Sequence, residues 1–273
     1  MEIYLPDTGA SDEKREYEDM LKTAIKAAKE SGKILMSYYG KVKVSYSGKY
    51  FDAAHIFTKA DYESGKKIIR ILKKEFPNHN IHCEIETKGK PVQIVNNSKY
   101  SWYIDPLDGT NNFTRGIPLF GISIGLIKDN QSILGVLYFP ALDLLVYAEK
   151  GKGAFANGKR IKVSNRELKK SLYMTHGYFK GKPQLIKRIA DKVGLIKIID
   201  ASSFELAQIA IGNAELYILE SVMHDVAAGV IIVKEAGGKV TDYNGTEWRP
   251  ASKGIVVSNR KIHNEVLKLL NKR

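Results

Sequence analysis

The sequence has one cysteine and no long apolar run. Cys83 cannot form a disulfide within the chain, and no apolar run approaches the roughly 18–20 residues of a membrane-spanning helix. The first residues, MEIYLPDTGASDEKREYED, lack the basic and apolar regions of a secretory signal. These absences argue against a disulfide scaffold and against a membrane protein, and they favour the cytoplasm.

Positive charge, in contrast, is in excess. The 273 residues include 43 Lys and Arg against 30 Asp and Glu, for a net charge of +13. A basic surface can attract phosphate esters or nucleic acid, but it can also be a lysine-rich solvated surface such as thermophiles use. The lysines are spread along the chain and form no aromatic–basic repeat, which favours the solvated surface and argues against nucleic acid as a partner.

The apolar pattern predicts an α+β protein with two halves. In the first half we expect helices over 11–39 and 61–76, a strand, loop and return over 41–57, and an extended piece over 81–86. Short turns then separate strand-like runs that predict an antiparallel sheet, at 101–105, 120–128, 132–139, 143–149 and 153–163.

After about residue 165 the pattern changes to strand–helix alternation. Strands are expected at 171–175, 196–200, 215–220, 239–242 and 254–258. Helices are expected at 183–193, 203–211, 225–236 and 261–271. We therefore expect an N-terminal α+β lobe (1–165) and a C-terminal α/β lobe (166–273) within one compact unit.

The segment WYIDPLDGTNNFTRG, residues 102–116, ends a strand in two carboxylates. Pro106 fixes the backbone after Asp105, so that Asp105 and Asp108 can converge on one point. Gly109 allows close approach to an anion, and the N–H groups of Gly109 and Thr110 open a helical turn suited to phosphate. The pattern suits Mg²⁺-assisted phosphoryl chemistry. The alternative, in which Asp108 caps that turn and Asp105 starts it, stays open.

A second segment, HDVAAGVIIVKEAGGKVTD (224–242), places Asp225 in the first turn of a predicted helix. Ala227, Ala228 and Gly229 are small enough for the helix to pack closely, and Gly237-Gly238 end it. A carboxylate here can also serve as an N-cap, so Asp225 alone does not establish a metal site.

Together these segments resemble the two signatures of the inositol monophosphatase superfamily. Further pieces match in the same order: Thr58-Lys59-Ala60-Asp61, FPNHNIHCE (76–84), GIPLFGISIGL (116–126) and GKGAFANGKRIKVS (151–164). The resemblance covers the chain from about residue 15. It implies a layered αβαβα sandwich, and it implies Mg²⁺-dependent hydrolysis of a phosphomonoester by a homodimeric, lithium-sensitive enzyme with two or three Mg²⁺ ions in each active site.

The resemblance also implies a role for each matching residue. Glu84, Asp105 and the Leu107 carbonyl would bind a first metal, and Asp105, Asp108 and Asp225 a second. Thr110, oriented by Asp61, would help to deprotonate the attacking water, and Glu84 would help to position it. Asp108 and the Gly109 and Thr110 amides would contact the phosphate. Cys83 is expected to pack rather than react.

Some positions depart from the family pattern. Glu84-Ile85-Glu86 replaces two adjacent glutamates, His224 stands where many members have tryptophan, and Glu220 is not at the spacing of the inositol-specific glutamate. The substrate therefore stays open. The first candidates are inositol 1-phosphate and fructose 1,6-bisphosphate. The alternative substrates are a 3′(2′),5′-bisphosphate nucleotide or NADP. The alternative kinds of protein are a catalytically inactive relative or a basic nucleic-acid-associated protein. Lys43, Lys49 and Arg115 are candidates for contacting a second phosphate.

Overall fold

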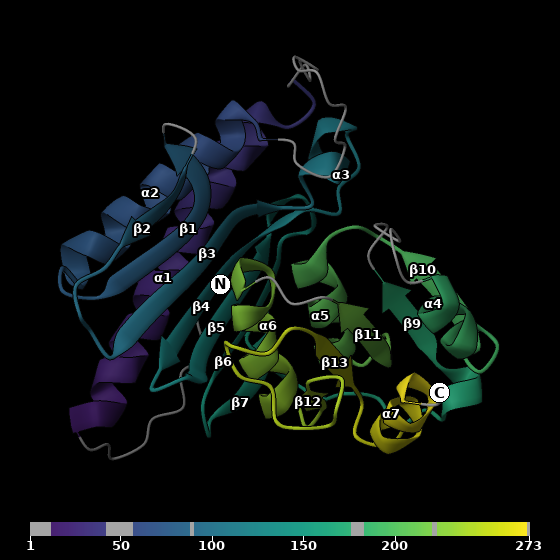
Figure 1. The fold of residues 1–273 in the computed structure, drawn as a ribbon. Helices are drawn as coiled ribbons and strands as arrows, with labels where there is room; N and C mark the ends of the chain where they lie inside the picture. Colours follow the sequence, from purple (N-terminus) through teal and green to yellow (C-terminus); the bar gives the residue numbers. More distant parts are fainter. Residues whose placement is uncertain (1–11, 42–56, 88–89, 176–182, 220–222, 272–273) are drawn as a thin grey trace.

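The computed structural model describes residues 12–41, 57–87, 90–175, 183–219 and 223–271. Its helices and sheets alternate in five layers (Figure 1). Two sheets separate three helical layers. Outside the first sheet lie α1 (Asp12–Tyr38) and α2 (Lys59–Glu75), and between the sheets lie α5 (Ser202–Ile211) and α6 (Met223–Glu235). Outside the second sheet lie α4 (Pro183–Ala190) and α7 (His263–Leu270). The predicted αβαβα sandwich is confirmed.

The first sheet has eight strands in the order β2-β1-β3-β4-β5-β6-β7-β8. Its strands are β1 (Asn80–Thr87), β2 (Lys90–Ile94), β3 (Tyr100–Asp108), β4 (Gly121–Lys128), β5 (Gln131–Phe139), β6 (Leu144–Glu149), β7 (Gly153–Ala156) and β8 (Lys159–Ile161). Only β1 and β3 pair in parallel; the other neighbours are antiparallel, as the short turns predict. Two expectations need correction: β2 was not predicted, and the run 153–163 is two strands joined at Asn157-Gly158.

The second sheet has five strands in the order β10-β9-β11-β13-β12. They are β9 (Leu172–Thr175), β10 (Leu195–Ile198), β11 (Leu216–Leu219), β12 (Lys239–Thr241) and β13 (Ile255–Ser258). β9 pairs in parallel with β10 and β11, whereas β13 is antiparallel to both of its neighbours. The strand–helix alternation expected after residue 165 therefore corresponds to a sheet with both parallel and antiparallel pairs. The expected strand over 41–57 lies outside the described residues except at its two ends.

Glycines in the first sheet let α6 approach unusually closely. A Cβ added to Gly125 on β4 would lie 2.7 Å from the Ala227 Cβ, and one added to Gly135 on β5 would meet the Ala228 carbonyl. The small residues of α6 were predicted to allow such packing. Because α6 lies directly on β4 and β5, its first turn is held close to the end of β3.

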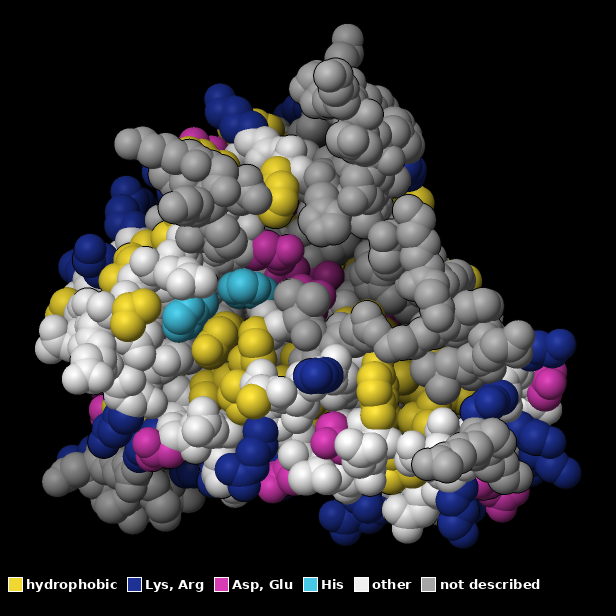
Figure 2. All heavy atoms as spheres, in the orientation of Figure 1, with side chains coloured by type: hydrophobic (Ala, Val, Ile, Leu, Met, Phe, Trp, Pro, Cys, Tyr) yellow, Lys and Arg dark blue, Asp and Glu magenta, His cyan; other side chains and the backbone are white. Residues whose placement is uncertain are grey.

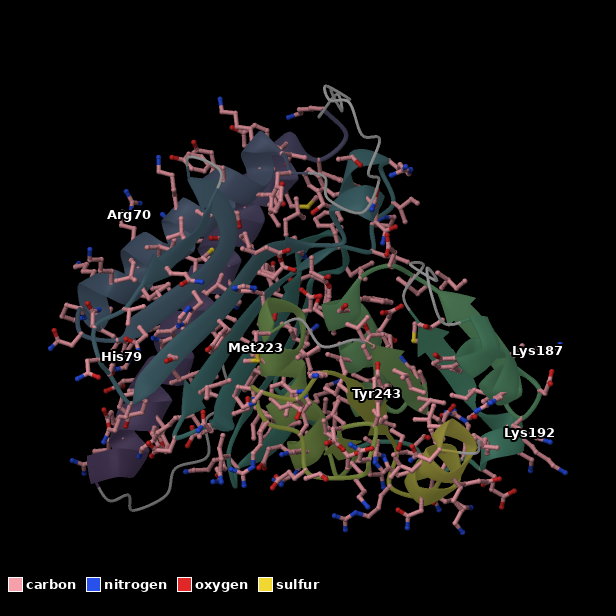
Figure 3. The ribbon with its side chains drawn as sticks, in the orientation of Figure 1. Arg70, His79, Lys187, Lys192, Met223 and Tyr243 are labelled. Atoms are coloured by element: carbon pink, nitrogen blue, oxygen red, sulfur yellow. The ribbon has the colours of Figure 1, made fainter. Side chains whose placement is uncertain are left out.

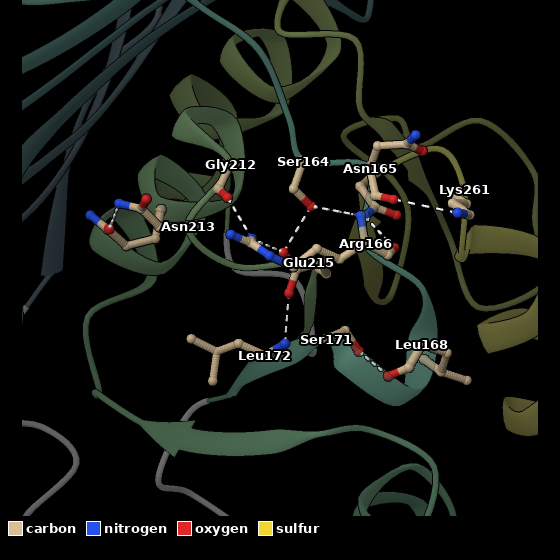
Figure 4. A network of polar contacts seen from close by, with 12 residues as sticks. Ser164, Asn165, Arg166, Leu168, Ser171, Leu172, Gly212, Asn213, Glu215 and Lys261 are labelled. Carbon is tan, nitrogen blue, oxygen red and sulfur yellow. Dashed lines mark hydrogen bonds and ion pairs between the residues drawn. The ribbon is translucent and has the colours of Figure 1, made fainter.

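The segment between the two sheets is fixed by Glu215, which is fully buried. Its carboxylate accepts hydrogen bonds from Ser164 Oγ at 2.8 Å, from Arg166 Nη1 at 2.7 Å and from Leu172 N at 2.6 Å (Figure 4). Each oxygen of this buried carboxylate therefore has a donor, as burial of a charge requires. The network attaches the connecting segment to the start of β9 and thereby joins the two sheets.

Charged side chains lie on the outside of this sandwich. Arg70 on α2, Lys187 on α4 and Lys192 are exposed and point away from the body of the molecule (Figure 3). This distribution agrees with a solvated basic surface. In the part of the chain that is described, no helix has both the length and the apolar character needed to cross a bilayer.

Candidate metal and phosphate site

Three carboxylates from distant parts of the chain meet at one end of the first sheet. Glu84 is on β1, Asp105 on β3 and Asp225 in the first turn of α6, and each offers an oxygen within 4.8 Å of the others. β1 and β3 are paired in parallel with Cys83 opposite Ile104, which places Glu84 beside Asp105. Figure 2 shows acidic side chains in a hollow of this face, with histidine side chains beside them.

The cluster is electrostatically unfavourable without a cation. Burial, and then the carboxylates of Glu84, Asp108 and Asp225, raise the pKa of Asp105 well above its ordinary value. Burial, and then Asp108 and Asp61, raise the pKa of Glu84 to about 7. A cation would relieve this repulsion, and an all-oxygen donor set fits a hard cation such as Mg²⁺. The donor set therefore fits the metal that the sequence implies.

A bulge in β3 turns Asp105 and Asp108 to the same side of the sheet. Asp105 pairs with Ser123 and Asp108 with Gly121, so three steps on β3 oppose two on β4. Residues three apart on a regular strand would face opposite sides, and the extra residue removes that difference. The bulge also leaves the Pro106 carbonyl to accept from Ser64 Oγ at 2.9 Å.

Asp108 is held by the first turn of α5. Its Oδ1 accepts from Ser202 N at 3.1 Å, and its Oδ2 accepts from Ser203 N at 2.7 Å and from the Ser203 hydroxyl. The interpretation of Asp108 as a cap for its own turn is wrong. That turn, α3 (Thr110–Thr114), has Gly109 as its N-cap and no side-chain cap. Asp108 instead satisfies amides at the start of a helix more than 90 residues away.

Asp61 and Thr110 are in contact, as the resemblance implies. Thr110 Oγ1 lies 3.2 Å from Asp61 Oδ1 and 2.8 Å from the Leu107 carbonyl oxygen. The other oxygen of Asp61 accepts from Thr58 N at 2.7 Å and from Thr58 Oγ1 at 2.6 Å, in a capping box at the start of α2. Burial raises the pKa of Asp61 to about 6, although Thr58 and Thr110 act against this rise.

The turn after Asp108 can only be built around glycine. Gly109 has φ +79°, and an added Cβ would lie 2.8 Å from the Leu119 carbonyl oxygen. Asn112 fixes the turn from inside by donating to the Leu119 and Ile199 carbonyls, each at 2.8 Å. Arg115 is exposed, and its Nη1 donates back to the carbonyl and side-chain oxygens of Asn111.

Rings lie directly beside the carboxylates, and two of them were not recognised in the sequence. His82 stacks on Tyr103 with centroids 4.7 Å apart, and Tyr103 lies 6.1 Å from His224. Burial lowers the pKa of His224 to about 4, so its ring is neutral near pH 7. Alternation along β1 and β3 could have revealed His82 and Tyr103, because each precedes a cluster carboxylate by two residues.

The remaining candidates divide into packed and undescribed residues. Cys83 is fully buried, and burial raises the pKa of its thiol to about 12, in agreement with a packing role. Lys43, Lys49, Glu220 and the side chain of Glu86 lie outside the described residues. No local pattern indicates that Ser202 and Ser203 would hold Asp108, because the three residues meet only in the folded chain.

Comparison of the chain with known proteins identifies its family. The model of the inositol monophosphatase family matches residues 16–273. A protein of Thermotoga maritima named fructose-1,6-bisphosphatase/inositol-1-monophosphatase is 37% identical over 93% of this chain and 96% of its own length. A Neisseria meningitidis protein named putative Nus factor SuhB is 33% identical over 92% of this chain and 97% of its own.

Similarity in three dimensions agrees. A solved structure described as the IMPase of Thermotoga maritima superposes with a TM-score of 0.82 at 36% identity, covering 93% of this chain and 97% of that one. Family match, relatives and fold thus coincide over nearly the whole length. The chain belongs to the inositol monophosphatase family, and it is a phosphoric monoester hydrolase.

Proposed function

We propose that the protein is a Mg²⁺-dependent phosphatase of small sugar or cyclitol phosphates, with inositol 1-phosphate and fructose 1,6-bisphosphate as first candidates. The observation that carries the proposal is the convergence of Glu84, Asp105 and Asp225 within 4.8 Å. The name of the Thermotoga maritima relative supports these two substrates.

Two metal positions would share Asp105. Glu84, Asp105 and the Leu107 carbonyl would hold one ion, and Asp105, Asp108 and Asp225 the other. When bound, the ions supply positive charge against the phosphate oxygens and lower the pKa of the attacking water. The raised pKa values of Glu84 and Asp105 support this assignment, because burial and neighbouring carboxylates raise them and a bound cation would offset that repulsion.

Asp61 and Thr110 would manage the proton of the attacking water. With Asp61 ionised and a metal ion on the Leu107 carbonyl, the Thr110 hydroxyl would donate its one proton to Asp61 Oδ1, which would orient the Thr110 oxygen to accept a proton or hydrogen bond from water. Thr58 holds Asp61 Oδ2 and thereby leaves Oδ1 for Thr110. The amides of Gly109 and Thr110 would bind the phosphate oxygens, since they open α3 with no side-chain cap.

The test is phosphate release with Mg²⁺ from a panel of four esters: inositol 1-phosphate, fructose 1,6-bisphosphate, 3′-phosphoadenosine 5′-phosphate and NADP. Asp105→Asn is the matched blank, because it removes the shared charge while keeping the side-chain shape. We expect turnover of a sugar or cyclitol phosphate, and a loss of at least about 100-fold in Asp105→Asn, since two-metal charge neutralisation is removed.

Preference for 3′-phosphoadenosine 5′-phosphate or NADP would contradict the proposed substrate class but not the proposed two-metal mechanism. Turnover by folded Asp105→Asn close to that of the parent would contradict the metal assignment itself. Circular dichroism of both proteins establishes that they are folded.

A second candidate function is association with nucleic acid. A net charge of +13 can attract nucleic acid even though the lysines are spread along the chain, and one relative is named as a putative Nus factor rather than as an enzyme. Binding to a labelled RNA at increasing salt tests it, because neutralised phosphates give a steep salt dependence. RNA binding that persists in Asp105→Asn would show a function separate from the phosphatase site.

A further inference from the structure

Hydrogen bonds from the first turn of α5 to the Asp108 carboxylate connect the two halves of the chain. Asp108 ends β3 of the first sheet, and Ser202 and Ser203 begin the helix between the sheets. Both serines are fully buried, and Asp108 is 7% exposed. Three donors of one helical turn therefore converge on a carboxylate that the proposed function assigns to metal binding.

The donors are divided unequally between the two oxygens. Oδ2 accepts from both the amide and the hydroxyl of Ser203, and these occupy its two lone pairs. Oδ1 accepts from the Ser202 amide. Ser203 thus holds one oxygen of Asp108 through two donors, and Ser202 holds the other through one. The start of α5 also carries positive partial charge, which favours the ionised carboxylate that a metal requires.

The two neighbouring serines use their hydroxyls differently. The Ser203 hydroxyl donates to Asp108, whereas Ser202 Oγ accepts from the Tyr217 hydroxyl at 2.8 Å. Loss of the Ser203 hydroxyl therefore acts on Asp108 directly. Loss of the Ser202 hydroxyl removes a contact between α5 and β11 and leaves both hydrogen bonds from Ser203 in place.

We propose that Ser203 is a positioning residue that fixes the Asp108 carboxylate and thereby sets the affinity of the second metal position. The inference rests on the proposed function, because it requires Asp108 to be a metal ligand. Residues that hydrogen-bond to metal ligands typically contribute 10- to 100-fold in metal affinity. Ser203 acts on the metal only through Asp108 and is not itself a ligand.

The test measures Mn²⁺ binding without substrate, using electron paramagnetic resonance to detect the free ion. Ser203→Ala is expected to weaken one class of sites about 10-fold, and Ser203→Thr, which keeps a hydroxyl, should recover at least part of that loss. Ser202→Ala is the matched comparison, because it deletes the same atom one residue earlier. We expect it to change the affinity by less than about threefold. Asp108→Asn should lose that class of sites.

Thermal unfolding in chelator accompanies each titration and separates loss of fold from loss of affinity. Weakening in Ser202→Ala equal to that in Ser203→Ala would overturn the inference, since any loosening of α5 would then suffice. Parent-like binding by Ser203→Ala with loss in Asp108→Asn would also overturn it, while leaving the proposed function intact. Parent-like binding by both variants would remove Asp108 from the metal site and contradict the proposed function as well.

Discussion

At the scale of single residues, the position of Asp61 depends on Thr58. Thr58 donates through both its amide and its hydroxyl to one oxygen of Asp61, while its Oγ1 accepts from the first amides of α2. The residue that orients Thr110 is thus part of a helix cap. Under the proposed function, stability and catalysis would therefore share one side chain at this point.

Replacement of Thr58 by Val tests that sharing. We expect a loss of about 1 kcal/mol in the free energy of unfolding from the broken cap. We also expect kcat to fall about tenfold, because Asp61 loses a donor that orients it for proton transfer. Urea unfolding and initial rates measure the two effects, with Thr58→Ser as control. A stable Val variant with unchanged kcat would show that the orientation of Asp61 does not depend on Thr58.

The sequence points to candidate residues wherever the signal is local. Asp105, Asp108 and Gly109 stand in one turn, and Asp225 stands at a helix start, so their neighbours identify them. Threonine three residues before Asp61 is likewise a capping pattern that can be read directly. The contact of Ser203 with Asp108 joins positions 95 apart, and no local pattern encodes it.

At the scale of elements, the distance between α6 and β4 determines where Asp225 lies. Gly125→Ala would place a Cβ 2.7 Å from both the Ala227 Cβ and the Ala228 amide nitrogen. We expect the helix to shift away, with a loss of about 1–3 kcal/mol in stability and weaker Mn²⁺ binding. Calorimetric unfolding and the metal titration described above measure these two effects.

Gly32→Ala is the control for this prediction, because it overpacks α1 against Tyr138 on the opposite face of the same sheet. It should lower stability without changing metal affinity. Equal losses of metal affinity in the Gly125 and Gly32 variants would mean that α6 does not position Asp225 specifically.

Most elements were predictable because their periodicity is strong. β2 was missed because Pro91 weakens its strand pattern and because, among the described strands, it pairs with β1 alone. The break between β7 and β8 could be read from the dipeptide Asn157-Gly158, a typical two-residue hairpin turn. Both residues have positive φ in the structure, as such a turn requires. The order of strands in the second sheet depends on contacts between distant segments and could not be read locally.

At the scale of the whole molecule, folding brings carboxylates from both halves into one poorly hydrated place. Burial and neighbouring charge raise the pKa of Glu84 from 4.5 to about 7, and burial raises that of Asp61 from 3.8 to about 6. A raised pKa in the folded state means that folding favours the protonated form. The stability from these groups is present at low pH and is lost as pH rises through about 6 to 7.

Mg²⁺ should therefore stabilise the protein more at about pH 8 than at about pH 5, because protons compete for the same oxygens at the lower pH. The rise in Tm on adding saturating Mg²⁺, measured at both values, checks this. Asp105→Asn provides the comparison. At about pH 8, its Tm should rise less on adding Mg²⁺ than the Tm of the parent. An equal rise at both pH values in the parent would indicate that Mg²⁺ binds away from these carboxylates.

The bulge in β3 has a consequence for how the site can be observed. Where the ladder is interrupted, Leu107 N donates to Asp105 Oδ1 at 3.0 Å instead of to a neighbouring strand. The solvent exchange and chemical shift of that one amide thus follow the carboxylate that both metal positions would share. The Leu107 amide is therefore a backbone reporter that lies one hydrogen bond from the carboxylate proposed to bind both metal ions.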